Sequence, residues 1–160
     1  SNLSDSGTLF SLILMLIGGS PGSTAGGLKT TTIAVVVIAV FAMAKGGDDI
    51  NTFKRRIVSD VVKQSAVIIL IYLFAVMLSS MIICSVEGLG MSQVLFETAS
   101  AAGTVGVSKG ITNQISAISK IILMIMMYGG RIGGLSLVLV FGQRKPEAPV
   151  KRPTEQILIG

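Results

Sequence analysis

Residues Thr104–Ser108, with the sequence Thr-Val-Gly-Val-Ser, are of types that can hold a dehydrated alkali cation. A row of backbone carbonyls can replace the water that such an ion loses, and Gly106 accepts backbone angles that let successive carbonyls point the same way. The preceding 11 residues, 92–102, are mostly apolar or small. As a helix they would measure about 16 Å, roughly half the hydrocarbon thickness of a bilayer. This spacing predicts a chain that enters a membrane partway, turns back and carries a cation filter. A glycine-containing turn between two helices is the alternative.

The predicted filter has a set of ion ligands and one supporting acid. Potassium is expected at the carbonyls of Thr104, Val105, Gly106 and Val107, and Ser108 completes the filter. The half-helix before the filter would direct the negative end of its dipole at the ion. Glu97 lies on this half-helix, where an unpaired charge is costly. Two interpretations of Glu97 are open: a buried, hydrogen-bonded carboxylate that holds the loop in shape, or a carboxylate that reaches solvent at the outer vestibule.

The composition indicates a membrane protein. Hydrophobic residues make up 51% of the 160-residue chain and charged residues 13%, and the mean hydropathy is +0.80. The absence of histidine excludes imidazole metal sites and histidine-based catalysis. The single cysteine, Cys84, permits no intrachain disulfide and is expected to be a buried small hydrophobe. Because the chain begins Ser1-Asn2-Leu3, without methionine, we expect an upstream part to be missing.

The first hydrophobic region, Thr8–Ala44, is too long for one straight span. Its 37 residues would form about 55 Å of helix, against roughly 30 Å of hydrocarbon. Five glycines and one proline between Gly18 and Gly27 interrupt it, which predicts a half-helix, a non-helical segment and a second helix over residues 28–43. Irregular backbone at membrane depth is tolerated only where protein covers it or water lines it. We therefore expect a flexible obstruction of the ion path, although a plain helix kink would give the same pattern.

The expected gate contains this glycine-rich segment and two basic residues. Its members are Gly18, Gly19, Ser20, Pro21, Gly22, Ser23, Thr24, Ala25, Gly26, Gly27, Lys29 and Arg131. Basic residues inside a membrane usually face a cavity and have a function. Lys29 can also extend to the cytoplasmic interface, whereas Arg131 is about 17 Å from the end of its span at Gly142. We expect Arg131 near the pore below the filter, bonded to carbonyls of the glycine-rich segment.

Two further regions complete an all-α membrane fold of helix–pore-loop–helix type. Residues 65–86 form 22 uncharged positions, a transmembrane helix. Residues 117–142 form another span, in which two pairs of glycines, Gly129/Gly133 and Gly130/Gly134, permit close backbone approach. Nine basic residues lie at 45–64 and 143–160, whereas the other side has only two, Lys109 and Lys120. This asymmetry predicts that residues 45–64 and the C-terminal tail are cytoplasmic.

The glycine-rich segment has partial similarity to two enzyme motifs. Residues 18–22 fit G-x-S-x-G, the nucleophile elbow, but without histidine the usual base for Ser20 is absent. The pattern around Gly27 and Lys29 is not a phosphate-binding loop, because Leu28 separates the two residues. An intramembrane serine hydrolase is thus a remote alternative, and the chain is not expected to be an enzyme.

Three segments resemble the Trk/Ktr/HKT superfamily of potassium transporters, most closely the membrane subunit of bacterial Ktr-type systems. Ile17–Thr32 is similar to the intramembrane gating loop, Glu97–Thr112 to a pore helix with its filter, and Gly129–Phe141 to the last helix with its basic residue. The resemblance implies four helix–pore-loop–helix repeats around one pore. Residues 1–44 would then contain the broken second helix of the third repeat. The fourth repeat, residues 65–142, would comprise helix 65–86, pore helix 92–102, filter 104–108 and helix 117–142.

The resemblance also implies partners and a location. The membrane subunit would be a homodimer in the cell membrane, regulated by a cytosolic nucleotide-binding RCK ring, and often coupled to sodium. Residues 155–160 resemble tails that dock at the dimer interface, with a disordered tail as the alternative. One filter of four cannot form the pore alone. A homotetrameric two-helix channel is the other interpretation, although the additional broken helix and Val107-Ser108, where a symmetric filter usually has Tyr-Gly, disfavour it.

Overall fold

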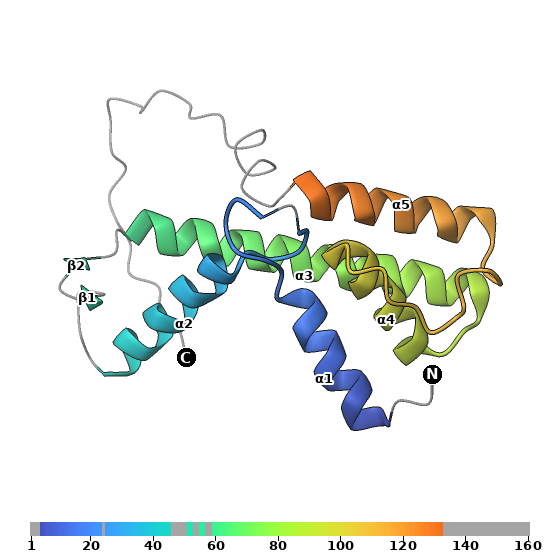
Figure 1. The fold of residues 1–160 in the computed structure, drawn as a ribbon, viewed down its shortest axis with the longest axis horizontal. Coiled ribbons are helices and arrows are strands. Elements are labelled where there is room, and N and C mark those ends of the chain that lie inside the picture. The colour runs from blue at the N-terminus through green and yellow to red at the C-terminus, as the bar shows by residue number, and fades with distance from the viewer. Residues whose placement is uncertain (1–3, 24, 46–50, 53–54, 57–58, 133–160) are drawn as a thin grey trace, which may run out of the picture.

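A computed structural model describes residues 4–23, 25–45, 51–52, 55–56 and 59–132. This part of the chain is helical, as expected (Figure 1). Its helices are α1 (Asp5–Leu16), α2 (Thr30–Ala44), α3 (Ser59–Glu87), α4 (Met91–Gly103) and α5 (Ala117–Ile132). Between α2 and α3, two strands of two residues each, β1 (Asn51–Thr52) and β2 (Arg55–Arg56), pair antiparallel. Residues 133–142 of the last expected span and the tail 143–160 lie outside the described residues.

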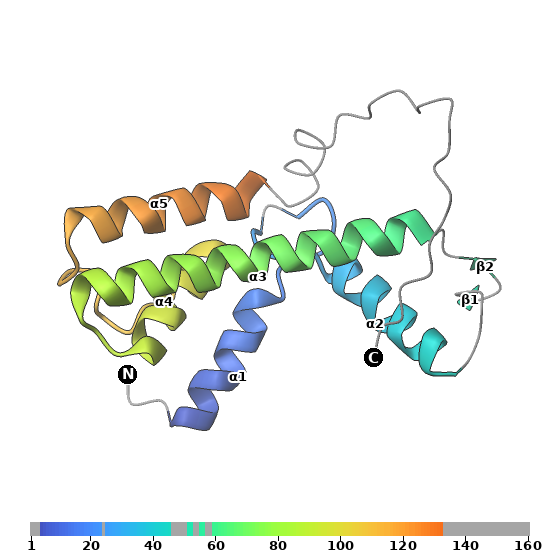
Figure 2. The same cartoon turned by 180° about the vertical axis from the view of Figure 1, so that it is seen from behind.

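The first hydrophobic region is broken between α1 and α2. The intervening segment returns on itself, because Ile17 and Leu28 form a parallel bridge. The Gly18 N–H donates to the Leu28 carbonyl at 2.7 Å, and the Thr30 N–H donates to the Gly19 carbonyl at 3.3 Å. The segment is therefore a loop with a closed base, from which α1 and α2 leave in different directions (Figures 1 and 2).

α3 is the long helix of the described structure. Among the described residues, Asp60–Glu87 is the one helical stretch long and apolar enough to cross a membrane, with a mean hydropathy of 2.8. α3 begins at Ser59, upstream of the span 65–86 expected from sequence. Figures 1 and 2 show α2 beside its first half and α4 and α5 beside its second half.

The chain from α4 to α5 follows a re-entrant path (Figures 1 and 2). α4 begins near the C-terminal end of α3 and ends near the middle of the molecule. Residues 104–116, called the return loop below, then run back to the end of the molecule at which α4 begins. α4 has 13 residues, which correspond to about 20 Å, less than a bilayer crossing. α5 starts at this end and runs back along α3.

α4 is the most deeply buried helix, because α1, α3 and α5 all contact it. A hydrophobic cluster joins it to its neighbours and to the return loop; its members are Ile83, Val94, Ala101, Ile111, Ile115 and Leu123. A polar contact lies beside this cluster. The hydroxyls of Ser80 on α3 and Thr98 on α4 are 2.6 Å apart, and both side chains are fully buried. A buried hydroxyl pair fixes the rotation of α4 more narrowly than apolar contacts do.

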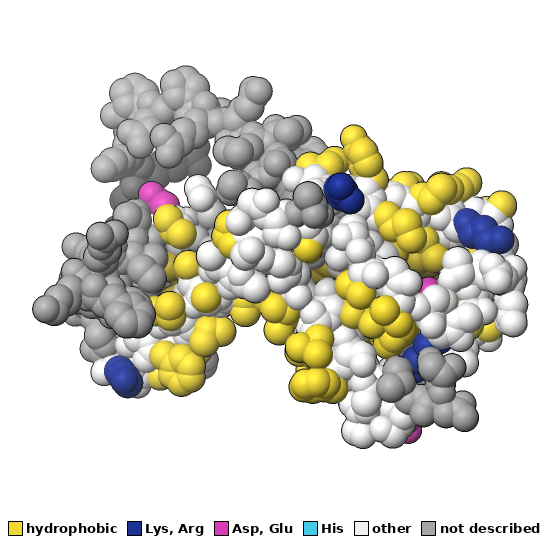
Figure 3. All heavy atoms as spheres, viewed as in Figure 1, with side chains coloured by type: hydrophobic (Ala, Val, Ile, Leu, Met, Phe, Trp, Pro, Cys, Tyr) yellow, Lys and Arg dark blue, Asp and Glu magenta, His cyan; other side chains and the backbone are white. Residues whose placement is uncertain are grey.

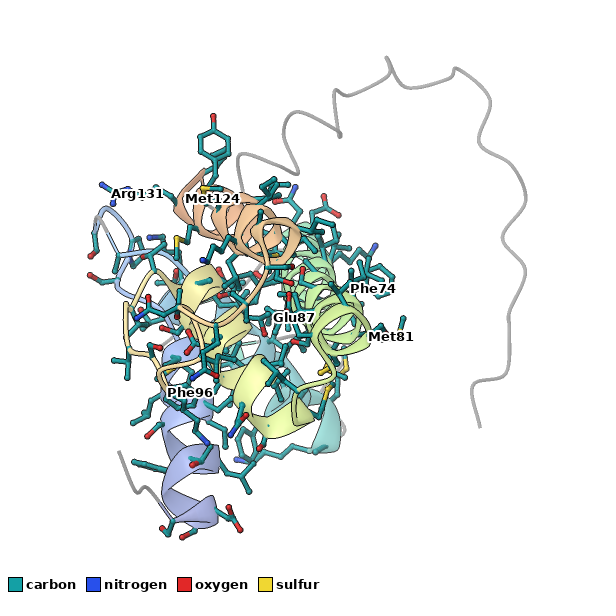
Figure 4. The ribbon with its side chains drawn as sticks, turned by 90° about the vertical axis from the view of Figure 1, so that its right-hand side faces the viewer. Phe74, Met81, Glu87, Phe96, Met124 and Arg131 are labelled. Carbon is teal, nitrogen blue, oxygen red and sulfur yellow. The ribbon has the colours of Figure 1, made fainter. Side chains whose placement is uncertain are left out.

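Glu87 joins the end of α3 to the start of α5. One of its carboxylate oxygens accepts hydrogen bonds from the Ser116 N–H at 2.9 Å, the Ser116 hydroxyl and the Ser119 hydroxyl. Figure 4 shows Glu87 directed between the helices. A carboxylate at a helix N-terminus satisfies unpaired donors and favours the helix dipole. The return loop is thus held at its far end by this contact.

Many large apolar side chains are exposed on the outer surface of the helices, and Figure 3 shows patches of them on one face. Phe74 on α3 is 68% exposed and Phe41 on α2 is 65% exposed. In Figure 4, Phe74 and Met81 point from α3 away from the other helices. Soluble monomers rarely expose this much apolar surface. The exposure therefore indicates a surface that is covered by lipid or by further protein.

Candidate ion-conducting site

The expected filter begins where α4 ends. Thr104 follows the last helical residue in the left-handed region, with φ of 54°, and is the one non-glycine residue with positive φ in the described part of the chain. A β-branched residue rarely adopts this conformation, and strained backbone of this kind gathers at functional sites. Gly106 has φ of 83°, which glycine adopts without strain. Of the three residues that directly follow the half-helix, Thr104 and Gly106 therefore have positive φ.

Glu97 is buried, with 6% of its surface exposed. Its carboxylate accepts hydrogen bonds from the Ser108 hydroxyl at 2.5 Å, the Lys109 N–H at 2.9 Å and the Thr112 hydroxyl at 3.2 Å. All three donors lie on the return loop, at or just after the end of the filter. Of the two interpretations left open by sequence, the structure has the buried carboxylate that bonds to the loop.

A cavity of about 510 Å³ lies between α4, the return loop and α5. Its lining includes residues that the sequence pattern had singled out at separate places, namely Glu97, Thr104, Gly106, Val107, Ser108 and Arg131. Arg131 is exposed at the end of the described part of α5 (Figure 4). The structure thus brings Glu97, residues of the expected filter and Arg131 to one space.

The glycine-rich segment contacts the first residue of the expected filter directly. The Gly26 N–H donates a 2.8 Å hydrogen bond to Oγ1 of Thr104. A Cβ atom added to Gly26 would lie 2.6 Å from both Oγ1 and Cγ2 of Thr104, so this approach requires glycine. The sequence did not predict this contact, because nothing in the pattern indicates which of the five glycines in the segment meets the filter. Thr24 lies outside the described residues.

Lys29, rather than Arg131, bonds to the segment within the described residues. Its Nζ donates to the carbonyl of Ala25 at 2.7 Å and to that of Ser23 at 3.3 Å. Because Lys29 lies two residues after the end of the segment at Gly27 and directly precedes α2, its side chain can reach back over the loop. The carbonyl contacts expected of Arg131 are therefore made by a different basic residue.

A second cavity, of about 520 Å³, lies beside the glycine-rich segment among α2, α3 and α5. Its lining is mostly apolar and includes Lys29, Tyr72 and Gly130. The Tyr72 hydroxyl is buried and has no hydrogen-bond partner among the described residues. Open space thus lies between the segment and the helices α2 and α3, in addition to the contact that the segment makes with Thr104.

Comparison with known proteins decides the family. Residues 1–151 match the sequence model of the family described as TrkH, cation transport protein. The chain belongs to the TrkH family. The superfamily resemblance noted from the three sequence segments is therefore confirmed. TrkH proteins are transporters and not enzymes, which removes the serine hydrolase alternative for Ser20.

Individual members of the TrkH family are similar over nearly the whole chain. Ktr system potassium uptake protein D of Bacillus subtilis is 38% identical over 160 residues, which cover 100% of this chain and 36% of that protein. Potassium/sodium uptake protein NtpJ of Enterococcus hirae is 37% identical over 169 residues, covering 99% of this chain and 36% of the relative. Ktr system potassium uptake protein B of Bacillus subtilis is 32% identical over 152 residues, covering 95% and 34%. The chain thus spans about a third of the length of these relatives.

Proposed function

We propose that this chain is the C-terminal part of a potassium-translocating membrane subunit and that Thr104–Ser108 is one of its selectivity filters. The observation that carries the proposal is the re-entrant path of α4 and the return loop, at whose turning point these residues lie. Carbonyls from Thr104 to Val107 would replace the hydration shell of potassium. The C-terminal end of α4 would add its negative dipole potential at the same place. Relatives named as potassium uptake proteins support this choice of ion.

The glycine-rich segment Gly18–Gly27 would be the gate. Its hydrogen bond to Thr104 supports this role, because it holds the segment against the inner end of the filter. Lys29 would stabilise the closed position through the Ala25 and Ser23 carbonyls. Arg131, in the cavity beside the filter, would place positive charge in the cation path.

The complete pore would contain four helix–pore-loop–helix repeats, of which residues 65–142 are the fourth and residues 1–44 contain the end of the third. We propose that complete subunits form homodimers and that a cytosolic nucleotide-binding RCK ring regulates them. Residues 45–64 and 143–160 would face the cytoplasm, in line with their basic residues. We propose sodium as the coupling ion; one relative is named a potassium/sodium uptake protein.

The filter assignment predicts that Gly106→Ser weakens the discrimination of potassium from sodium in the complete membrane subunit, meaning this chain together with its upstream repeats. Any side chain at φ of 83° is strained, so the backbone would relax and turn its carbonyls. A cost of about 1 kcal/mol at one site corresponds to a roughly fivefold loss of discrimination. The loss of discrimination is measured by competitive uptake of rubidium and sodium into cells that lack other potassium uptake systems.

Gly88→Ser is the matched control for this prediction. Gly88 has φ of 65° and, like Gly106, nothing within 4 Å of an added Cβ atom, but it lies in the turn between α3 and α4. The same backbone strain away from the filter should lower stability and leave ion discrimination intact. Unchanged discrimination in Gly106→Ser would count against the filter, as would equal losses in both variants.

The gate assignment predicts that Arg131→Ala, or removal of two residues from the exposed tip of the glycine-rich segment, raises potassium flux. The first change takes positive charge from the cation path, and the second shortens the obstruction. We expect an increase of at least about fivefold, the lower end of the usual coupling between two sites. Initial uptake rates at saturating potassium, normalised to protein in the membrane, measure it. A flux that stays at the starting value in both variants would end the gate proposal.

A further inference from the structure

Lys109 directly follows the expected filter, and its side chain has no part in the proposed function. We propose that Lys109 weakens the binding of cations at the outer end of the filter, because its ammonium group is held there as a fixed positive charge. The proposal rests on the proposed function, since it assigns a further affinity-determining residue to the proposed filter. In the orientation proposed above, this end faces away from the cytoplasm and is the end at which potassium enters.

Two neighbouring residues of α4 hold Lys109 at two points. The backbone N–H of Lys109 donates to the Glu97 carboxylate at 2.9 Å. Its Nζ lies over the ring of Phe96, 5.2 Å from the ring centroid, within the range of about 6 Å at which an aromatic face attracts a cation. Because Phe96 is buried, with 1% of its surface exposed, packing fixes the ring. The position of the ammonium is therefore set by α4, the helix that ends at the filter.

The ring holds the ammonium without neutralising it. An aromatic ring attracts a cation through its quadrupole and has no net charge, so the field of the ammonium persists beyond the ring. The opposite charge comes from Glu97, whose carboxylate lines the cavity together with residues of the expected filter. A filter must bind an ion strongly enough to admit it and weakly enough to release it. In this arrangement Glu97 contributes to the first requirement and Lys109 to the second.

The size of the effect follows from Coulomb's law. Repulsion between two unit charges on the order of 10 Å apart changes a binding constant by about twofold in water and by about fourfold at half the dielectric constant of water. Lys109 is partly exposed, so dissolved salt screens its charge. The screening length is about 30 Å at 0.01 M salt and about 3 Å at 1 M. The effect should therefore be full in dilute medium and small in concentrated salt.

The test is the concentration dependence of uptake in Lys109→Gln, made in the complete subunit. Rubidium uptake into cells that lack other potassium uptake systems is measured at about 0.01 M ionic strength and again with about 0.5 M choline chloride, with sorbitol keeping the osmolarity equal. In dilute medium we expect the half-saturating rubidium concentration to fall by about two- to fourfold. In choline chloride it should match that of the unsubstituted subunit. Structural damage would instead lower the maximal rate or raise the half-saturating concentration in both media.

Three further variants separate the charge from its position. Lys109→Arg keeps both the charge and the contact with the ring, and should behave as the unsubstituted subunit does. Lys120→Gln removes the other basic residue of this side, which is exposed on α5, and should leave the half-saturating concentration unchanged. Phe96→Leu keeps the charge but removes the aromatic face that holds it. We expect a shift in the same direction as in Lys109→Gln, but smaller.

An unchanged half-saturating concentration for Lys109→Gln in dilute medium would overturn the proposal, as would a shift of the same size in choline chloride. An equal shift in Lys120→Gln would also overturn it, because the effect would then belong to the surface charge in general. These results do not depend on whether Phe96→Leu reaches the membrane. Lost discrimination in Gly106→Ser together with an unaltered Lys109→Gln would retain the filter and remove only the role of Lys109.

Discussion

Replacement of Glu97 by alanine is expected to reduce potassium uptake by the complete subunit to below about a tenth of its normal rate and to remove ion discrimination. Three donors of the return loop, on Ser108, Lys109 and Thr112, would lose their common acceptor. Glu97 is buried, and a hydrogen bond to a charged group contributes about 1.5–3 kcal/mol, more than a neutral one. The loop behind the filter would leave its present path. Uptake of rubidium and of sodium, with membrane expression as the reference, measures both effects.

Glu97→Gln separates the shape of this network from its charge. The amide oxygen can still accept from Ser108 and Lys109, and the Thr112 hydroxyl can turn to accept from the amide nitrogen. We expect discrimination to persist with reduced uptake. Glu87→Gln is the control, because Glu87 also accepts several hydrogen bonds, but from Ser116 and Ser119 at the start of α5. Normal discrimination in Glu97→Ala would show that the carboxylate does not hold the filter.

Gly130→Ala is expected to separate α5 from α4 and to destabilise the subunit strongly. A Cβ atom at Gly130 would overlap the carbonyl oxygen of Ala102 and lie 2.8 Å from its carbonyl carbon. Because the opposing atoms belong to the backbone of α4, no side chain can rotate away. Overpacking of this kind costs about 1–3 kcal/mol or more. Thermal unfolding in detergent, followed by gel filtration of the heated protein, measures the loss.

Gly129→Ala is the matched control, because a Cβ atom added to the neighbouring glycine would have nothing within 4 Å. Alanine is the better helix former by about 1 kcal/mol, so this variant should equal or exceed the parent in stability. Equal stability of the two variants would contradict the close approach of α4 and α5 at Gly130. The pair also tests the small-residue pattern, in which the two glycines are equivalent by spacing alone.

The helices and their breaks could be predicted from the sequence, because lengths and glycine positions decide them. The 37 residues of Thr8–Ala44 exceed one crossing, and the structure ends α1 at Leu16 and starts α2 at Thr30. Residues 92–102 were expected as a half-helix, and α4 occupies Met91–Gly103. These are local properties, which composition over ten to twenty residues expresses.

The contacts between elements could not be predicted in the same way. The sequence placed Glu97 on the half-helix but left its environment open, because burial depends on the path of the loop that follows. The sequence also predicted that Arg131 donates hydrogen bonds to carbonyls of the glycine-rich segment, whereas Lys29 donates to two of them. Helical spacing predicts the face of a helix on which a residue lies, but not which groups a long, flexible side chain will contact. Glu87 was missed altogether, although a glutamate at the end of a span followed by Ser-x-x-Ser at residues 116–119 is a recognisable pairing for a helix start.

The bridge between Ile17 and Leu28 has a mechanical consequence. Because the base of the glycine-rich loop is tied, its tip can swing while α1 and α2 keep their directions. For the proposed gate, the blockage would then clear without any change in the area that the subunit occupies in the plane of the bilayer. Membrane tension shifts an equilibrium only between states that differ in this area. It would therefore have little effect on the opening of such a gate.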